Sequence, residues 1–291
     1  MEGFSYSENS RSASTFQTSS DVLLRNNVHI VGEGKQPLLL CNGFGCNQHI
    51  WRYLVPSLAQ HYQLVLFDYV GTGETDSNAY DPQKYSTLAG YAQDVVEICQ
   101  ALALRDAIIM GHSVGAMIAM QAAIQAPAHF AKAILLTATP YCLNEPGYYG
   151  GIERTDALQM LDLLEKDFQT WATLFASMVM GQSHPTSLGE ELIDYFCALD
   201  KGTARQFIEI TLFSDNRANI PRLRLPTLLV QCADDVVAPT EVTEYLIQHL
   251  PHASLVTLPV AGHCPHLSAP LETLAAIQDF LASPSVAVLA G

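Results

Sequence analysis

The chain has 291 residues, 49% of them hydrophobic and 15% charged, so it is long enough to bury a large core as one domain or two small ones. Its 29 acidic and 14 basic residues give a net charge of −15. This charge argues against nucleic acid or an anionic membrane as a partner, because like charges repel.

Cysteine content and the N-terminal residues bear on the compartment. The seven cysteines form no CxxC pair, which indicates free thiols in a reducing compartment. Residues 1–20 are rich in Ser and Thr and lack the apolar stretch of a signal peptide, so we expect a disordered leader there and a flexible tail at 284–291. No apolar run reaches the length of a membrane span. We therefore predict a cytoplasmic protein.

The first half of the chain alternates strand-like and helical segments. Strands are expected at Asn27–Gly34, Pro37–Cys41, Leu64–Asp68, Ala107–Met110 and Ala133–Thr137. Helices are expected at Ile50–Gln60, Leu88–Leu102 and Ala116–Gln125. The continuous apolar strands are typical of a parallel sheet that is buried on both faces. This β-α-β-α order predicts an α/β fold with a mostly parallel, doubly wound sheet, of about eight strands in all.

The alternation stops between Pro140 and Ser214, where the sequence pattern is helical. Four helices are expected, at Thr155–Lys166, Phe168–Val179, Leu188–Ala198 and Thr203–Phe213. We interpret residues 140–214 as a helical cap inserted above the strand ends of a core formed by 21–139 and 215–283. The large apolar side chains of this segment either line a pocket or only pack the cap helices together; they are Trp171, Phe175, Met178 and Phe213.

The sheet pattern resumes after the cap. Strands are predicted at Thr227–Gln231 and Ser254–Leu258, with a helix ending near Leu250 and a last helix at Leu271–Leu281. Ligands of such sheets bind beyond the carboxyl ends of the strands. The loops that follow the strands are therefore where candidate functional residues are sought.

The most informative of these loops is Gly111-His112-Ser113-Val114-Gly115. It joins an apolar strand to a helix, which is the setting of a nucleophile elbow. The two glycines let chain segments pass closely at a crowded turn, and Ser113 projects its hydroxyl at the end of the sheet. His112 is expected to pack beside the sheet and border the pocket rather than act as a base.

A serine hydroxyl needs a base and a third group that orients the base. Asp235 follows one strand and His263 follows the next, so both come from loops at the same end of the sheet as Ser113. Asp234 is the alternative acid, and His266 is interpreted as a structural or pocket residue. A metal pair at His263 and His266 is disfavoured, since no further ligand cluster accompanies it.

Two backbone amides are expected to form an oxyanion hole. One belongs to Val114, at the start of the elbow helix, and the other to Phe44, in the glycine loop Asn42–Gly45. The Phe44 ring is expected to roof the pocket over Ser113. The loop 71–75, GTGET, superficially resembles a dinucleotide loop, but its third glycine is missing, so nucleotide binding is not predicted there.

These motifs together resemble the α/β-hydrolase superfamily. The order Ser, Asp, His, the D-x-x-A-P pattern at Asp235 and the Gly-His pair at 262–263 are typical of it. The segments NGFGCNQHIW, LFDYVGTGETD, GHSVGAMIAM, WATLFA, FSDNR and AGHCPHLS resemble its RsbQ-like branch of bacterial stress-response hydrolases and the related plant strigolactone and karrikin receptors. From Val22 to Leu281, this resemblance implies a four-helix lid over an apolar pocket lined by Trp171 and Phe175.

The resemblance implies two kinds of function. The first is a serine hydrolase, without metal or cofactor, that cleaves a small, largely apolar ester or lactone. The second is a ligand-gated regulator with slow or incidental hydrolysis, whose output passes through the cap to a protein partner, such as a PAS-domain signalling protein. Carbon–carbon bond hydrolysis and perhydrolysis would use the same triad and remain open. A dehalogenase is disfavoured, because it would carry a carboxylate in place of Ser113.

Overall fold

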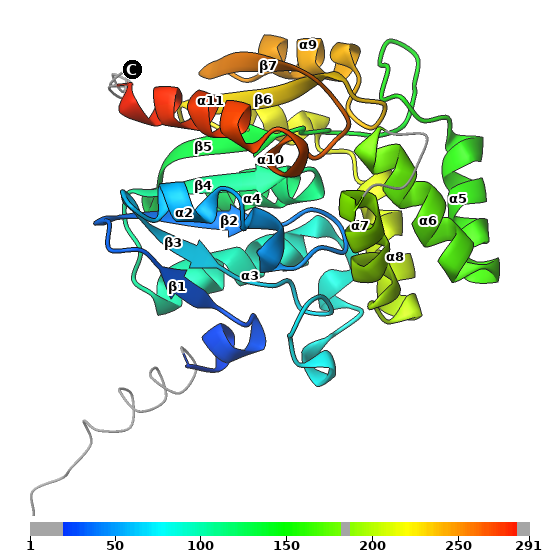
Figure 1. Cartoon of the computed structure of the whole chain (residues 1–291), viewed down its shortest axis with the longest axis horizontal. Helices are drawn as coiled ribbons and strands as arrows, with labels where there is room; N and C mark the ends of the chain where they lie inside the picture. The colour runs from blue at the N-terminus through cyan, green and yellow to red at the C-terminus, as the bar shows by residue number, and fades with distance from the viewer. Residues whose placement is uncertain (1–19, 182–186, 284–291) are drawn as a thin grey trace, which may run out of the picture.

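The computed structural model describes residues 20–181 and 187–283. The predicted tail, 284–291, and the predicted leader, 1–20 except for Ser20, lie outside these residues. Residues 20–25 form a short helix before the first strand. Figure 1 shows a central sheet flanked by helices, with a separate group of helices beyond one end of the strands.

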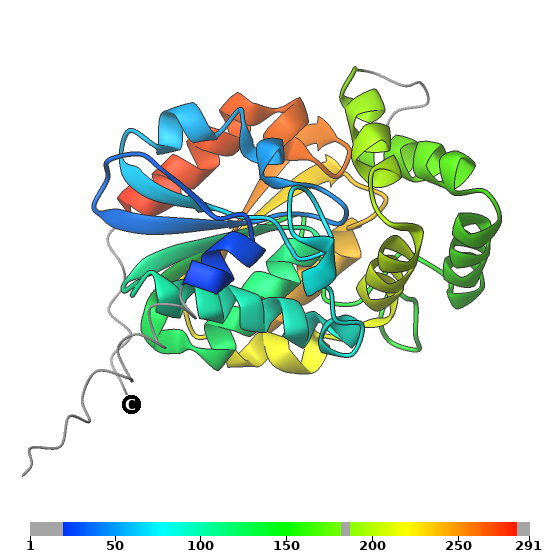
Figure 2. The same cartoon turned by 90° about the horizontal axis from the view of Figure 1, so that it is seen from below.

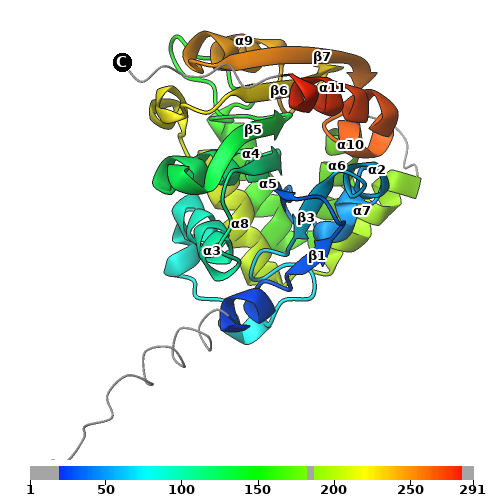
Figure 3. The same cartoon turned by 90° about the vertical axis from the view of Figure 1, so that its left-hand side faces the viewer.

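One mixed sheet forms the centre of the fold. Within the described residues it has seven strands, in the order β1-β3-β2-β4-β5-β6-β7, with β1 antiparallel to β3 and every other pair parallel. The strands are β1 (His29–Val31), β2 (Gln36–Cys41), β3 (Tyr62–Leu66), β4 (Ala107–His112), β5 (Phe130–Leu136), β6 (Thr227–Asp234) and β7 (Ala253–Ala261). The expected α/β architecture is confirmed, with seven strands in place of about eight. Figure 3 shows how the sheet twists between β1 and β7.

The central strands are apolar because both of their faces are covered. Every residue of β4 is buried, as are the last four residues of β2 and the last five of β5. Helices α2 (Val55–Leu58) and α11 (Pro270–Ala282) lie on one face of the sheet. Helices α3 (Leu88–Ala101) and α4 (Val114–Gln125) lie on the opposite face, as Figure 2 shows, and α9 (Thr240–His249) packs against β6 and β7. This double cover makes the fold doubly wound.

The predicted helix Ile50–Gln60 is the main error in the core. The segment instead forms a 3₁₀ turn at Gln48–Trp51 and the single-turn helix α2. Pro56 explains the break, because a proline inside one continuous helix would lack an N–H donor and would clash with the preceding turn. It is tolerated where it stands, in the first turn of α2.

Four helices follow β5, where the sequence predicts a cap. They are α5 (Arg154–Lys166), α6 (Phe168–Met180), α7 (Ser187–Cys197) and α8 (Lys201–Phe213). Figure 1 shows them grouped beyond the strand ends from which the loops after β4 and β6 emerge. A last short helix, α10 (Pro265–Ser268), precedes α11. No helix among the described residues has both the length and the apolar character to cross a bilayer.

Candidate active site

Ser113 occupies a strained turn between β4 and α4. Its φ and ψ are 56° and −127°, and its N–H donates to the Leu136 carbonyl at 3.0 Å. A Cβ at Gly111 would overlap the Gly115 carbonyl, and a Cβ at Gly115 would overlap the Asn42 carbonyl. The turn therefore requires glycine on both sides, as the motif predicts. The strain is of the kind that positions a side chain for function.

A chain of hydrogen bonds runs from Ser113 to a buried carboxylate. His263 Nε2 lies 2.8 Å from Ser113 Oγ, and His263 Nδ1 lies 2.8 Å from Asp235 Oδ2. The histidine is 2% exposed and the aspartate 6% exposed, so the contacts between them are shielded from water. The structure thus brings together the three side chains that the sequence singles out. A positioned imidazole between a hydroxyl and a carboxylate is able to take the hydroxyl proton.

The choice between the two adjacent aspartates follows from this geometry. Asp234 is the last residue of β6 and is exposed, whereas Asp235 turns inward. The second oxygen of Asp235, Oδ1, accepts N–H donors from Val237 at 2.9 Å and Ala238 at 3.1 Å. These two bonds fix the carboxylate, which leaves Oδ2 facing the imidazole.

The histidine loop is held by the core and by a cap helix. The His263 carbonyl accepts hydrogen bonds from Thr137 Oγ1 at 2.9 Å and from His112 Nε2 at 2.8 Å. The His263 N–H donates to the Val179 carbonyl, in α6, at 2.7 Å. The preceding Gly262 has φ 92°, and a Cβ there would lie 2.5 Å from the Met180 carbonyl oxygen. The position of α6 is thus tied directly to the position of the imidazole.

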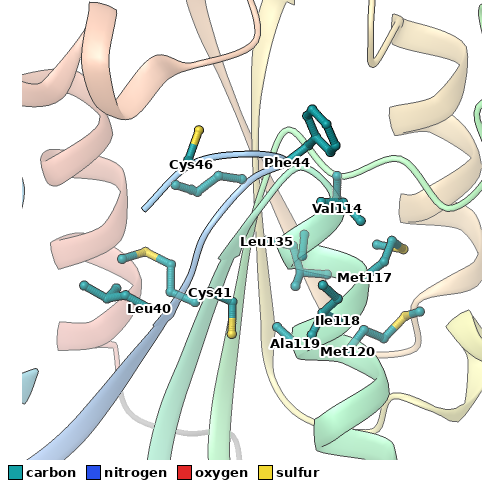
Figure 4. Packing of buried hydrophobic residues seen from close by; sticks show 14 of the residues in the cluster. Leu40, Cys41, Phe44, Cys46, Val114, Met117, Ile118, Ala119, Met120 and Leu135 are labelled. Carbon is teal, nitrogen blue, oxygen red and sulfur yellow. The ribbon is translucent and has the colours of Figure 1, made fainter. Parts of the chain in front are cut away.

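The two residues expected to supply an oxyanion hole flank the serine. Val114 is the first residue of α4, and Phe44 lies in the loop after β2. Both line the same pocket as Ser113. Figure 4 shows the Phe44 ring above the start of α4, next to Val114. The N-terminus of α4 places a positive helix end beside the serine.

The pocket over Ser113 is lined mostly by apolar side chains. Four of the predicted lining residues are present: Phe44, His112, Phe175 and Met178. Lining residues that the sequence analysis did not name include Val179, Leu192, Phe196, Ile208, Leu212 and Asn216. Most of these lie on α6, α7 and α8, so the predicted cap helices provide much of the wall.

Two predicted pocket residues are not part of the lining. Trp171 is 1% exposed and stacks on Phe175 at 5.2 Å, which places it behind the wall. Phe213, at the end of α8, is covered by the Arg154 guanidinium, 5.1 Å from its ring centre. Both side chains pack the cap, which is the alternative that their sequence pattern left open.

Two further histidines form a buried layer beneath the site. The rings of His112 and His266 lie 4.4 Å apart, and His266 packs on Trp51 at 4.9 Å. Burial, followed by the neighbouring histidine charges, holds the pKa of His112 well below its usual value. Burial also lowers the pKa of His266, to about 3. Both rings are therefore neutral at neutral pH, so His266 has the packing role that the sequence indicates.

Three thiols also line the pocket, and each could in principle compete with the serine as a nucleophile. They belong to Cys46, Cys142 and Cys264. Burial raises the pKa of the Cys142 thiol to about 12 and raises the pKa values of Cys46 and Cys264 as well. A protonated thiol is a weak nucleophile, so these side chains act as apolar wall. Within the described residues, no group of three or more His, Cys, Asp or Glu side chains could hold a metal ion.

The comparisons with known proteins agree on one family. Residues 38–277 match the family model described as "Alpha/beta hydrolase family". The chain is 35% identical over 246 residues to the karrikin insensitive 2 receptor CA of Petunia hybrida, covering 84% of this chain and 91% of that one. It is 35% identical over 254 residues to the strigolactone esterase D14 of Arabidopsis thaliana, covering 87% and 94%. The structure of olei00960, a hydrolase from Oleispira antarctica, superposes with a TM-score of 0.88 at 37% identity, covering 91% and 98%.

Proposed function

The chain belongs to the alpha/beta hydrolase family, and from this premise we propose that it is a serine hydrolase of small, largely apolar carboxylic esters or lactones. The observation that carries the proposal is the hydrogen-bonded chain Ser113–His263–Asp235, with 2.8 Å at each step, at the floor of an apolar pocket. Relatives named as strigolactone esterases support an ester or lactone substrate.

The first half of the proposed reaction acylates Ser113. His263 Nε2 takes the hydroxyl proton as Oγ attacks the ester carbonyl, and Asp235 holds the imidazole in the tautomer with its proton on Nδ1. The carbonyl oxygen gains negative charge and is stabilised by the amides of Phe44 and Val114. Removal of one such donor typically costs about 3 kcal/mol of transition-state stabilisation. The imidazolium then protonates the leaving alcohol.

The second half returns the serine. A water molecule, deprotonated by His263, attacks the acyl carbonyl, and the second tetrahedral intermediate collapses with proton return to Ser113 Oγ. Every step uses side chains, backbone amides and water. His112 beneath the site does not compete as a base, because burial holds its pKa well below the usual value for histidine.

Intact-protein mass spectrometry and turnover test this proposal together. The purified protein is incubated with p-nitrophenyl acetate and, separately, with a butenolide-type lactone. We expect product or an acyl adduct with the wild type and none with Ser113→Ala or His263→Ala, each with an unchanged far-UV spectrum. Ser268→Ala, which removes an exposed hydroxyl outside the pocket, is the matched control and should retain activity. Full activity of Ser113→Ala would overturn the assignment.

A second candidate function is a regulator in which the cap responds to the ligand and contacts a protein partner. The observation that favours it is the hydrogen bond from His263 N–H to the Val179 carbonyl, which ties the cap helix α6 to the catalytic loop. Pull-down from the native host, with and without substitutions on the outer face of the cap, tests it. If a PAS-domain or other signalling partner is captured and is lost when the cap is substituted, the regulator is supported. Fast turnover of a substrate with no captured partner rules the regulator out.

A further inference from the structure

The apolar pocket extends along one face of α4. Val114 and Met117 both line it, and Gln121 follows on the same helix face, because residues i, i+3 and i+7 share a face. Figure 4 shows Met117 one turn below Val114, on the way down the helix. Gln121 is eight residues from Ser113, which corresponds to about 12 Å along the helix axis.

Asn216 belongs to the pocket lining and is bonded to Gln121. Its Oδ1 accepts a hydrogen bond from Gln121 Nε2 at 2.7 Å, and its main-chain N–H donates to the Pro140 carbonyl at 2.8 Å. The side chain is 2% exposed and belongs to the pocket lining. Asn216 therefore holds a fixed, buried amide in the pocket wall, bonded to a residue about two helical turns along α4 from the serine.

The Asn216 amide differs from two neighbouring polar groups of the pocket in its number of N–H or O–H donors. The hydroxyls of Thr139 and Thr211, also in the pocket lining, donate their single protons to the Val237 and Phe207 carbonyls. An asparagine amide has two N–H groups. One of them donates to the Ser214 carbonyl at 3.2 Å. No hydrogen bond of the second N–H to the described part of the protein is seen.

We propose that Asn216 determines substrate specificity by donating a hydrogen bond to an acceptor oxygen that the ligand carries away from its scissile carbonyl. The inference rests on the proposed ester or lactone hydrolysis. A purely hydrocarbon ligand would leave the buried donor without a partner, and an unpaired buried donor is costly. The preferred substrates are therefore small apolar esters or lactones with a second carbonyl or ether oxygen, not simple alkyl esters.

The test moves one oxygen atom along a chain of constant length. The parent p-nitrophenyl octanoate is compared with analogues in which an ether oxygen replaces each inner methylene in turn from C4 of the acyl chain onward. Octyl acetate is compared with the equivalent analogues from C3 of the alcohol chain onward, so that the ester group itself is unchanged. In the wild type we expect one position to show kcat/KM about tenfold above that of its neighbours in the series, as one hydrogen bond would give. In Asn216→Leu this maximum disappears while the parent ester is still cleaved.

Two further variants keep the test decisive. Thr211→Val removes a pocket hydroxyl whose proton is already donated to the Phe207 carbonyl. This variant should show the same maximum of kcat/KM as the wild type. Asn216→Asp retains an oxygen acceptor for Gln121 but lacks the N–H donor, so it replaces Asn216→Leu if that variant does not fold. The role of Asn216 would be overturned by either of two results. The wild type could show no maximum of kcat/KM along the series, or the maximum could persist after Asn216 is substituted. If none of the esters, including the two parents, is cleaved in a Ser113-dependent way, both the proposed function and this inference are overturned.

Discussion

His266 should make the protein less stable in mild acid, and His266→Phe should remove the contribution of this ring. The ring is fully buried against Trp51 and His112, and neither of its nitrogens has a hydrogen-bond partner among the residues that the structure describes. Burial, followed by repulsion from His263 and Arg52, lowers its pKa to about 3, against an ordinary value of 6.5. Phenylalanine keeps a planar ring and cannot take up a proton.

The sign and size of the effect follow from proton linkage. As the pH falls below about 6.5, the unfolded chain binds a proton on His266 and the folded chain does not until about pH 3, so the free energy of unfolding decreases over this window. Each pH unit is worth about 1.4 kcal/mol, so the loss between pH 6.5 and pH 5 is about 2 kcal/mol. We expect the variant to lose about 2 kcal/mol less than the wild type on going from pH 7 to pH 5.

Urea unfolding at pH 7, 6 and 5 measures this difference directly. Thr243→Val is the matched control, because it also replaces a buried side chain whose polar atom has no hydrogen-bond partner among the described residues, but it removes no titrating group. The control should lose as much stability in acid as the wild type. Equal acid losses in the wild type and His266→Phe would refute the reasoning.

Two further substitutions test the site and its attachment to the cap. Asp235→Asn keeps the shape of the side chain but disfavours the tautomer that His263 needs, so kcat for p-nitrophenyl acetate should fall by about 10³- to 10⁴-fold with the melting temperature nearly unchanged; retained kcat would contradict the assignment. Arg52→Met removes the two hydrogen bonds to Glu191, at 2.8 and 2.6 Å, that fasten α7 to the core. It should raise amide exchange in α7 while costing at most about 1 kcal/mol of global stability, and unchanged exchange would show that α7 is held by packing alone.

Local sequence patterns were sufficient for the fold and for the three side chains that meet in the candidate site. The elbow glycines leave little conformational choice at Ser113, and parallel strands deliver the loops of Asp235 and His263 to the same edge as the serine. The choice of Asp235 over Asp234 needed more than the strand pattern, because one carboxylate ends β6 and the next directly follows it. It depends on which of them turns inward to meet the N–H groups of Val237 and Ala238, and this is visible only in the folded loop.

The pocket wall could be predicted only in part, because helix periodicity gives a face and not a position along the axis. Trp171, Phe175 and Met178 lie on one face of α6, yet only the last two reach the pocket. Trp171 lies one turn further out, where it supports Phe175 and meets the edge of Phe44 at 6.0 Å. Asn216 lies in the segment between α8 and the sheet, where no periodic pattern exists, and its partner Gln121 is 95 residues away. Because the groups that would select a substrate come from such long-range contacts, related sequences with the same three hydrogen-bonded side chains can differ in the ligands they accept.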